Sequence, residues 1–181
     1  HSDWSFKEHP PIGTCLFGIT IPPHGGETLF ANQHLAYENM PASLKEKINE
    51  LTAVHSAAAA YSPEGLYGKE DPALNRAMQP IISEEARATQ THPLVQVHPS
   101  NGKKAVYGCL GYTTGIDGMS DEESFSLLAD LHQWQIKEEN IYSHQWRENM
   151  LVMWDNRSVL HRATGGYEGY DRLLHRTTIW P

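Results

Sequence analysis

The 181-residue sequence is poor in cysteine, in positive charge and in long apolar runs. Two cysteines, Cys15 and Cys109, are too few for a disulfide framework, so we expect free thiols packed as small apolar side chains in a reducing, cytoplasmic compartment. The 14 Lys and Arg against 22 Asp and Glu give a net charge of −8, which argues against a nucleic-acid partner. No apolar run reaches the roughly 20 residues that a membrane-spanning helix needs, so we expect no membrane partner.

The apolar pattern predicts a mainly β protein with flanking helices. Runs of apolar and β-branched residues bounded by turn formers predict strands at 14–22, 27–31, 93–98, 103–109, 140–146, 150–155, 158–163 and 172–180. The segment Pro99-Ser100-Asn101-Gly102 between two of them is a hairpin signal. Helices are confined to connections and no repeat or linker is found, so we expect one domain over residues 1–181 with a β-sandwich or jelly-roll fold.

Two helices and one long loop are also expected. Residues 41–54 carry apolar side chains at helical spacing, at Leu44, Ile48 and Leu51. Residues 121–137 form the second predicted helix. Ser120 and Glu123 match a capping box at its start, and an apolar stripe follows at Phe125, Leu128, Leu131 and Trp134. Residues 59–91 are polar and irregular, a length typical of a lid or a binding loop.

Three residues from the two ends of the chain form a candidate metal-ligand set: His1, Asp3 and His161. On a strand, His1 and Asp3 would point to the same face, and His161 lies among apolar neighbours in a distant predicted strand. Chance alone gives about one His-x-Asp or His-x-Glu pair in a chain of this composition, so the pair has weight only with the second histidine. Two imidazoles and one carboxylate suit non-haem Fe(II) and leave coordination positions open for oxygen chemistry.

The last predicted strands contain further polar candidates. By the alternation of side chains along a strand, Arg172 and Arg176 share one face. Guanidinium groups that point into a β-barrel need anions, which favours carboxylate ligands. Asp155 and Asn156 are turn formers at the end of an apolar strand, and both a structural role and a role in the site stay open for them.

Five stretches, in this order, carry a pattern that covers nearly the whole chain: His1–Phe6 (HSDWSF), Pro23–Phe30 (PHGGETLF), His98–Lys104 (HPSNGKK), Trp154–Ala163 (WDNR through HRA) and Arg172–Thr178 (RLLHRTT). Together they resemble the taurine dioxygenase / 2,4-dichlorophenoxyacetate dioxygenase family of Fe(II)- and 2-oxoglutarate-dependent oxygenases. The resemblance implies a double-stranded β-helix, a cupin-like jelly roll, in one oxygenase catalytic domain that lacks its N-terminal portion here.

The resemblance also implies roles for single residues. It assigns His1, Asp3 and His161 to the iron. It assigns Thr28 and Arg172 to the distal carboxylate of 2-oxoglutarate, and Arg176 to an anionic group of the substrate.

The implied activity is that of a dioxygenase, an oxidoreductase that uses Fe(II), 2-oxoglutarate and O2. It hydroxylates a small anionic organic substrate, a sulfonate or a carboxylate that is taurine-like or aryloxyalkanoate-like, and releases succinate and CO2. The identity of the substrate and the assembly of the chain into a homo-oligomer stay open.

Two alternatives also stay open. A copper monooxygenase uses an N-terminal histidine, and His1 would offer an amine and an imidazole, but Asp3, Arg172 and Arg176 would then have no role. A jelly-roll protein that binds a metal or a ligand without catalysis is the other alternative, because a fold alone implies no activity. Iron-dependent formation of succinate distinguishes this second alternative from an enzyme.

Overall fold

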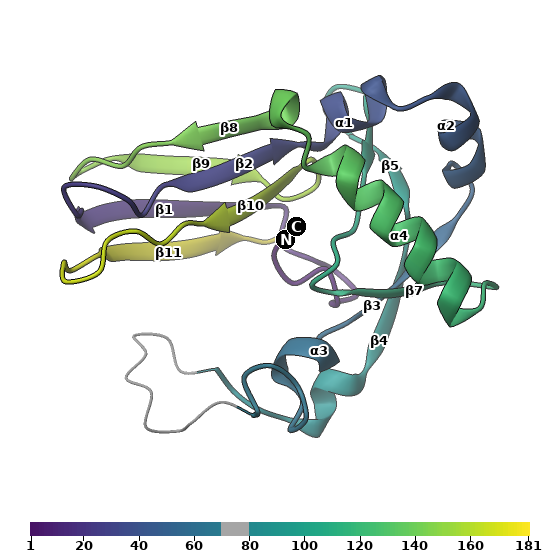
Figure 1. Ribbon diagram of the computed structural model, residues 1–181, viewed down its shortest axis with the longest axis horizontal. Helices are drawn as coiled ribbons and strands as arrows, with labels where there is room; N and C mark the ends of the chain where they lie inside the picture. The colour runs from purple at the N-terminus through teal and green to yellow at the C-terminus, as the bar shows by residue number, and fades with distance from the viewer. Residues whose placement is uncertain (70–79) are drawn as a thin grey trace.

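Short strands make up most of the regular structure in residues 1–69 and 80–181, the part of the chain that the computed structural model describes (Figure 1). The strands are β1 Gly13–Thr20, β2 Thr28–Asn32, β3 Thr52–Ser56, β4 Thr89–Pro93, β5 Val95–Val97, β6 Lys104–Val106, β7 Thr113–Ile116, β8 Ile141–His144, β9 Leu151–Asp155, β10 Val159–Ala163 and β11 Leu173–Ile179. The helices are α1 Gln33–Asn39, α2 Ala42–Ile48, α3 Ala58–Tyr61 and α4 Asp121–Gln135, with 3-10 turns η1 Glu84–Arg87 and η2 Glu138–Asn140. The expectation of a mostly β protein with few helices is confirmed.

Two antiparallel sheets have the strand orders β11-β1-β9 and β10-β2-β8, and their strands overlap in the view of Figure 1. Aromatic side chains join them, since the rings of Phe30 on β2 and Trp154 on β9 lie 5.2 Å apart. A third sheet, β4-β3-β7, and the hairpin β5-β6 complete the pairing. The hairpin confirms the turn signal at residues 99–102.

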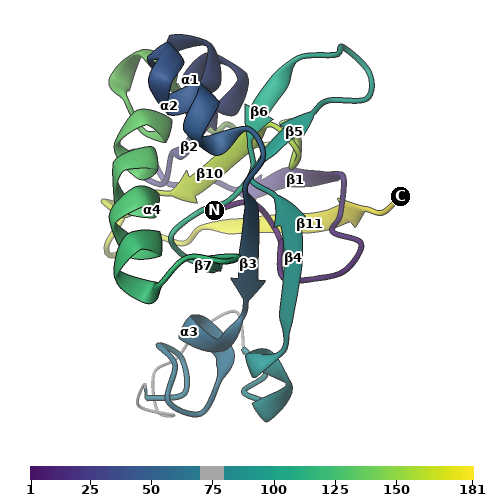
Figure 2. The ribbon, with the colours of Figure 1, turned by 90° about the vertical axis from the view of Figure 1, so that its right-hand side faces the viewer.

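The larger apolar core lies beside the two sheets, between α2, α4 and the strands β3, β5, β6 and β7 (Figure 2). Helix α4 begins with the expected capping box of Ser120 and Glu123. Its buried apolar residues are Leu127, Leu128 and Leu131. The stripe was wrong at one position, because Phe125 is 71% exposed and Leu127 takes its place in the core.

The predicted helix over residues 41–54 is wrong after Ile48. The chain leaves the helix at Asn49, and Thr52–Ser56 forms β3 between β4 and β7. Pairing on both edges of β3 outweighs the helical spacing, because β-branched Thr52 and Val54 suit a strand. Helix α1 was not expected, although Asn32 caps it by accepting from two backbone N–H groups.

The expected irregular stretch at residues 59–91 contains regular turns at both ends. Helix α3, turn η1 and the start of β4 fall within it, and residues 70–79 lie outside the described part. Both cysteines are free; Cys109 is buried and Cys15 is half-buried, close to the expectation. Among the described residues, no helix is long and apolar enough to cross a membrane.

Asp155 connects the β5-β6 hairpin to the turn between β9 and β10. Its carboxylate lies 2.9 Å from Nε2 of His98 and accepts from both Nε and Nη2 of Arg157, at 2.8 and 2.5 Å. Burial alone would raise the pKa of Asp155, but the hydrogen bonds from Arg157 and His98 outweigh it and lower the pKa to about 2.

This contact predicts a dependence of stability on pH. A carboxyl group with a lowered pKa stabilises the fold above its ordinary value, 3.8, and loses this effect as the pH falls through about 2. We expect Asp155→Asn to lower the free energy of unfolding at pH 7 by on the order of 1 kcal/mol, and the two proteins to converge near pH 2. Urea unfolding across this range tests it; a constant difference between the proteins from pH 4 to pH 2 would contradict it.

Candidate metal centre

The backbone brings the first residue of the chain against β10. His1 N donates to His161 O at 3.0 Å, and His161 N donates to His1 O at 2.9 Å, which is the exchange of a paired position in an antiparallel sheet. The expected strand through His1 and Asp3 is wrong, because a turn begins at Asp3 directly after this single pairing. The side chains meet nonetheless: ligand atoms of His1, Asp3 and His161 all lie within 4.8 Å of one another.

The carboxylate of Asp3 is buried, and its two oxygens face different partners. Oδ2 accepts from the hydroxyl of Thr14 at 2.5 Å and pairs with Nη2 of Arg176 at 2.9 Å. Oδ1 faces the two imidazoles, 3.4 Å from Nε2 of His1 and 3.7 Å from Nε2 of His161. One oxygen is therefore satisfied by protein donors, while the other converges with two nitrogens.

The imidazole of His161 is held mainly by packing. Its ring lies 4.7 Å from the ring of Trp154 and 4.3 Å from that of His1. Burial lowers the pKa of His161 below its ordinary value, so the ring is neutral at pH 7 and Nε2 can offer a lone pair. Its buried Nδ1 has no hydrogen-bond partner in the described part of the chain.

These features fit a metal ion. A neutral imidazole and an ionised carboxylate are the forms that bind metals, and the donor set of two histidines and one aspartate is that of non-haem Fe(II) sites with open positions. The family resemblance assigned Arg176 to an anionic group of the substrate and did not identify Asp3 as its partner. The guanidinium of Arg176 also lies 5.8 Å from the ring of Trp4.

Arg172 and Thr28 lie in a different part of the site. Nε of Arg172 donates to Gly26 O at 3.1 Å, two residues before Thr28, and its guanidinium lies 5.8 Å from the Tyr167 ring. Among the described residues, no carboxylate pairs with Arg172, and burial lowers the pKa of its guanidinium. The hydroxyl of Thr28 is buried and accepts from Nε1 of Trp146 at 3.0 Å.

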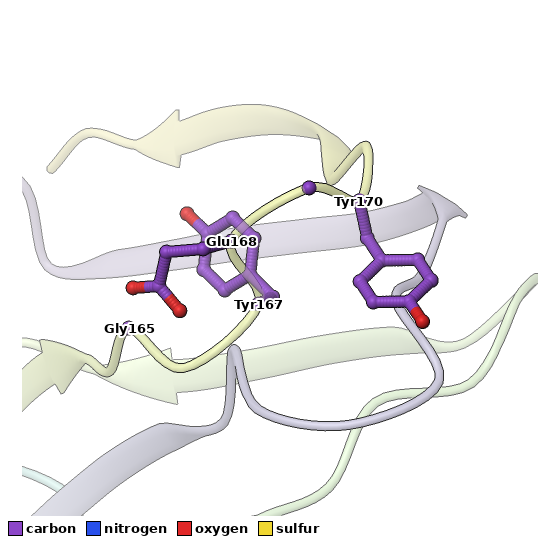
Figure 3. A pocket seen from close by; sticks show the side chains of 5 residues that line it. Gly165, Tyr167, Glu168 and Tyr170 are labelled. Atoms are coloured by element: carbon purple, nitrogen blue, oxygen red, sulfur yellow. The ribbon is translucent and has the colours of Figure 1, made fainter.

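A cavity of about 390 Å³ is lined by residues of one loop and not by the three candidate ligands. Figure 3 shows it in the loop between β10 and β11, where Tyr167, Glu168 and Tyr170 line it. Tyr167 belongs both to the wall of this cavity and to the neighbourhood of the Arg172 guanidinium.

The chain is similar in sequence to known proteins. The model of the family described as "Taurine catabolism dioxygenase TauD, TfdA family" matches residues 1–178. The chain is 34% identical over 180 residues to an alkylsulfatase of Acinetobacter baylyi. The matched region is 99% of this chain and 55% of that protein. It is 33% identical over 181 residues to an alpha-ketoglutarate-dependent 2,4-dichlorophenoxyacetate dioxygenase of Cupriavidus pinatubonensis. The matched region is 98% of this chain and 58% of that protein.

The fold also matches solved structures. The structure of AAD-2 in complex with Mn(II) and N-oxalylglycine superposes with a TM-score of 0.82 at 29% identity, over 99% of this chain and 67% of that one. The chain thus spans just over half the length of the two relatives above, and two thirds of this structural neighbour.

Proposed function

Because this chain belongs to the taurine catabolism dioxygenase TauD, TfdA family, we propose that it oxidises a small organic anion with Fe(II), 2-oxoglutarate and O2. The proposal includes a double-stranded β-helix as the fold, which the two neighbouring antiparallel sheets support. It also includes one catalytic domain over residues 1–181. Relatives named as 2-oxoglutarate-dependent dioxygenases, and the neighbour bound to Mn(II) and N-oxalylglycine, support the cosubstrate and the metal.

The observation that carries the proposal is that the two oxygens of the Asp3 carboxylate face different partners. Oδ1 converges with Nε2 of His1 and of His161, while Thr14 and Arg176 satisfy Oδ2. The three converging atoms would hold Fe(II). When bound, the iron supplies the activation of O2, and the balanced reaction converts substrate, 2-oxoglutarate and O2 into hydroxylated substrate, succinate and CO2.

For Arg172 we propose a contact with the distal carboxylate of 2-oxoglutarate, helped by the hydroxyl of Thr28. Its guanidinium is half-buried, and its described partners are a backbone carbonyl and the ring of Tyr167, a residue that lines the cavity. A buried cation of this kind gains most from a carboxylate, which accepts two parallel hydrogen bonds from one guanidinium.

For Arg176 we propose a contact with the acid group of the substrate. One nitrogen of the guanidinium pairs with Asp3, and a guanidinium has five N–H donors, so further donors stay free for a second anion. The side chain is 38% exposed, which leaves it accessible. An anion at this place would lie next to the candidate iron ligand, where a substrate has to be.

The substrate class leads to a direct prediction. Removing the charge of the substrate leaves donors of Arg176 without an anion, so we expect the amide of an accepted acid to react with kcat/KM lower by about tenfold or more. Turnover of matched acid and amide pairs, followed as succinate, tests this. Equal turnover of the two would show that Arg176 serves only the ion pair with Asp3.

The proposed activity is tested by measuring succinate release with a panel of sulfonates, sulfate esters and aryloxyalkanoates. We expect release that requires Fe(II) and rises with at least one of these acids. Binding of Fe(II) and 2-oxoglutarate without any succinate would instead favour a ligand-binding protein without catalysis.

A further inference from the structure

We propose that Asn156, acting through Thr14, is a positioning residue that aims the Asp3 carboxylate at the metal. This inference rests on the proposed function, because it concerns the same three candidate ligands. Asn156 occupies the turn between β9 and β10 and is 2% exposed.

Every polar group of Asn156 has a partner. Its backbone N–H donates to Ile12 O at 3.0 Å, and its carbonyl accepts from the hydroxyl of Ser2 at 2.7 Å. In the side chain, Nδ2 donates to Thr14 Oγ1 at 2.9 Å and to Pro11 O at 3.3 Å. Oδ1 accepts from Nε1 of Trp154 at 3.0 Å.

The contact with Thr14 has a fixed direction. A threonine hydroxyl has one proton, and an amide nitrogen can only donate, so Thr14 has to accept from Asn156. The single proton of Thr14 is then free to go to Oδ2 of Asp3, at 2.5 Å. This order occupies Oδ2 and turns Oδ1 toward the two imidazoles, which is the orientation that a metal needs.

Asn156 is linked to each of the other two candidate ligands, His1 and His161, by one residue that it contacts. Ser2, which it anchors, lies between His1 and Asp3 in the chain. Trp154, whose indole N–H it accepts, packs against the ring of His161. Metal-bound histidines usually have their second nitrogen fixed by a hydrogen bond, but Nδ1 of His161 has none among the described residues, so ring packing takes over this task.

The test is the affinity for Mn(II), measured by calorimetry on the folded 181-residue chain without cosubstrate. We expect Asn156→Ala and Thr14→Val each to weaken binding about tenfold, as is typical when a group that orients a metal ligand is lost. Thr14→Ser keeps the hydroxyl, and we expect it to restore nearly full affinity. The double variant should lose no more affinity for Mn(II) than the weaker-binding single variant, because Asn156 acts on Asp3 through Thr14.

Asn140→Ala is the matched control. Asn140 is also a buried asparagine, 3% exposed, but its amide donates to Trp134 O and not to the network of Asp3. This variant should lower the melting temperature of the metal-free chain and leave the affinity for Mn(II) unchanged. If Asn140→Ala weakens binding as much as Asn156→Ala does, general destabilisation explains the loss and the inference is overturned.

The remaining outcomes separate this inference from the proposed function. Wild-type affinity in Asn156→Ala and Thr14→Val, with binding lost in Asp3→Ala, would overturn the inference and leave the metal site standing. Absence of Mn(II) binding in the wild-type chain would overturn both. If Asn156→Ala does not fold, Thr14→Val against Thr14→Ser decides, and equal affinity of these two would refute the inference.

Discussion

Asp3→Ala is expected to abolish succinate formation and to weaken metal binding by at least about 100-fold, since it removes a ligand where loss of an outer contact alone costs 10- to 100-fold. The carboxylate of Asp3 is the one anionic group among the three candidate ligands, and its Oδ1 is the atom on which both imidazoles converge. Its removal also leaves Arg176 without its carboxylate partner. Metal affinity by calorimetry and succinate by chromatography measure the two effects.

Asp130→Ala is a suitable control for this variant. Asp130 is exposed on helix α4, far along the chain from the ligands, and alanine favours a helix. The control should bind metal and release succinate as the wild-type chain does. Turnover of Asp3→Ala at the wild-type rate would rule out the assignment of His1, Asp3 and His161.

Arg172→Met should raise the half-saturating concentration of 2-oxoglutarate about 10- to 150-fold. A hydrogen-bonded charged group contributes about 1.5–3 kcal/mol, and each 1.4 kcal/mol corresponds to a factor of about ten in affinity. Methionine keeps much of the unbranched apolar stem, so packing near Tyr167 should change little. Initial rates at increasing 2-oxoglutarate, with the primary substrate saturating, measure the shift.

Arg147→Met provides the control, because Arg147 is exposed before β9 and has no ion pair among the described residues. It should leave the half-saturating concentration unchanged. A result in which Arg172→Met alters only the affinity for the primary substrate would mean that Arg172 and Arg176 have exchanged roles.

Local signals in the sequence predicted the local structure well. The capping box of α4 and the turn at residues 99–102 depend on residues within a few positions of each other, and both are present. The end of α2 was missed because β3 is stabilised by two partner strands, one at residues 89–93 and one at 113–116. The spacing of apolar residues within 41–54 gives no information about those two partner strands.

In the candidate site, too, the sequence predicted some features and missed contacts between residues far apart in the chain. Residue types and order grouped His1, Asp3 and His161, and their ligand atoms do lie together, while their role as iron ligands stays a prediction. Strand alternation predicted that Arg176 shares a face with Arg172, but the contact of Arg176 with Asp3 joins residues 173 positions apart and has no sequence signal.

The contacts of two polar residues of the site could not be predicted from the sequence. Thr14 reads as an ordinary β-branched strand residue, yet its hydroxyl donates to Asp3. The sequence fits Asn156 equally well as a turn former and as a residue of the site. Only its contacts with Ser2, Thr14 and Trp154 distinguish between these two roles. A buried hydrogen-bond network has no periodicity that a sequence could show.

The most direct test of the central claim is a crystal structure of this chain with Mn(II) and N-oxalylglycine, with the metal located by its anomalous scattering. We expect one metal peak within about 2.0–2.4 Å of Nε2 of His1, Oδ1 of Asp3 and Nε2 of His161, as for oxygen and nitrogen ligands in protein metal sites. The far carboxylate of N-oxalylglycine should contact Arg172. A metal peak at any other place, or a soaked crystal with no peak between these three side chains, would contradict the account.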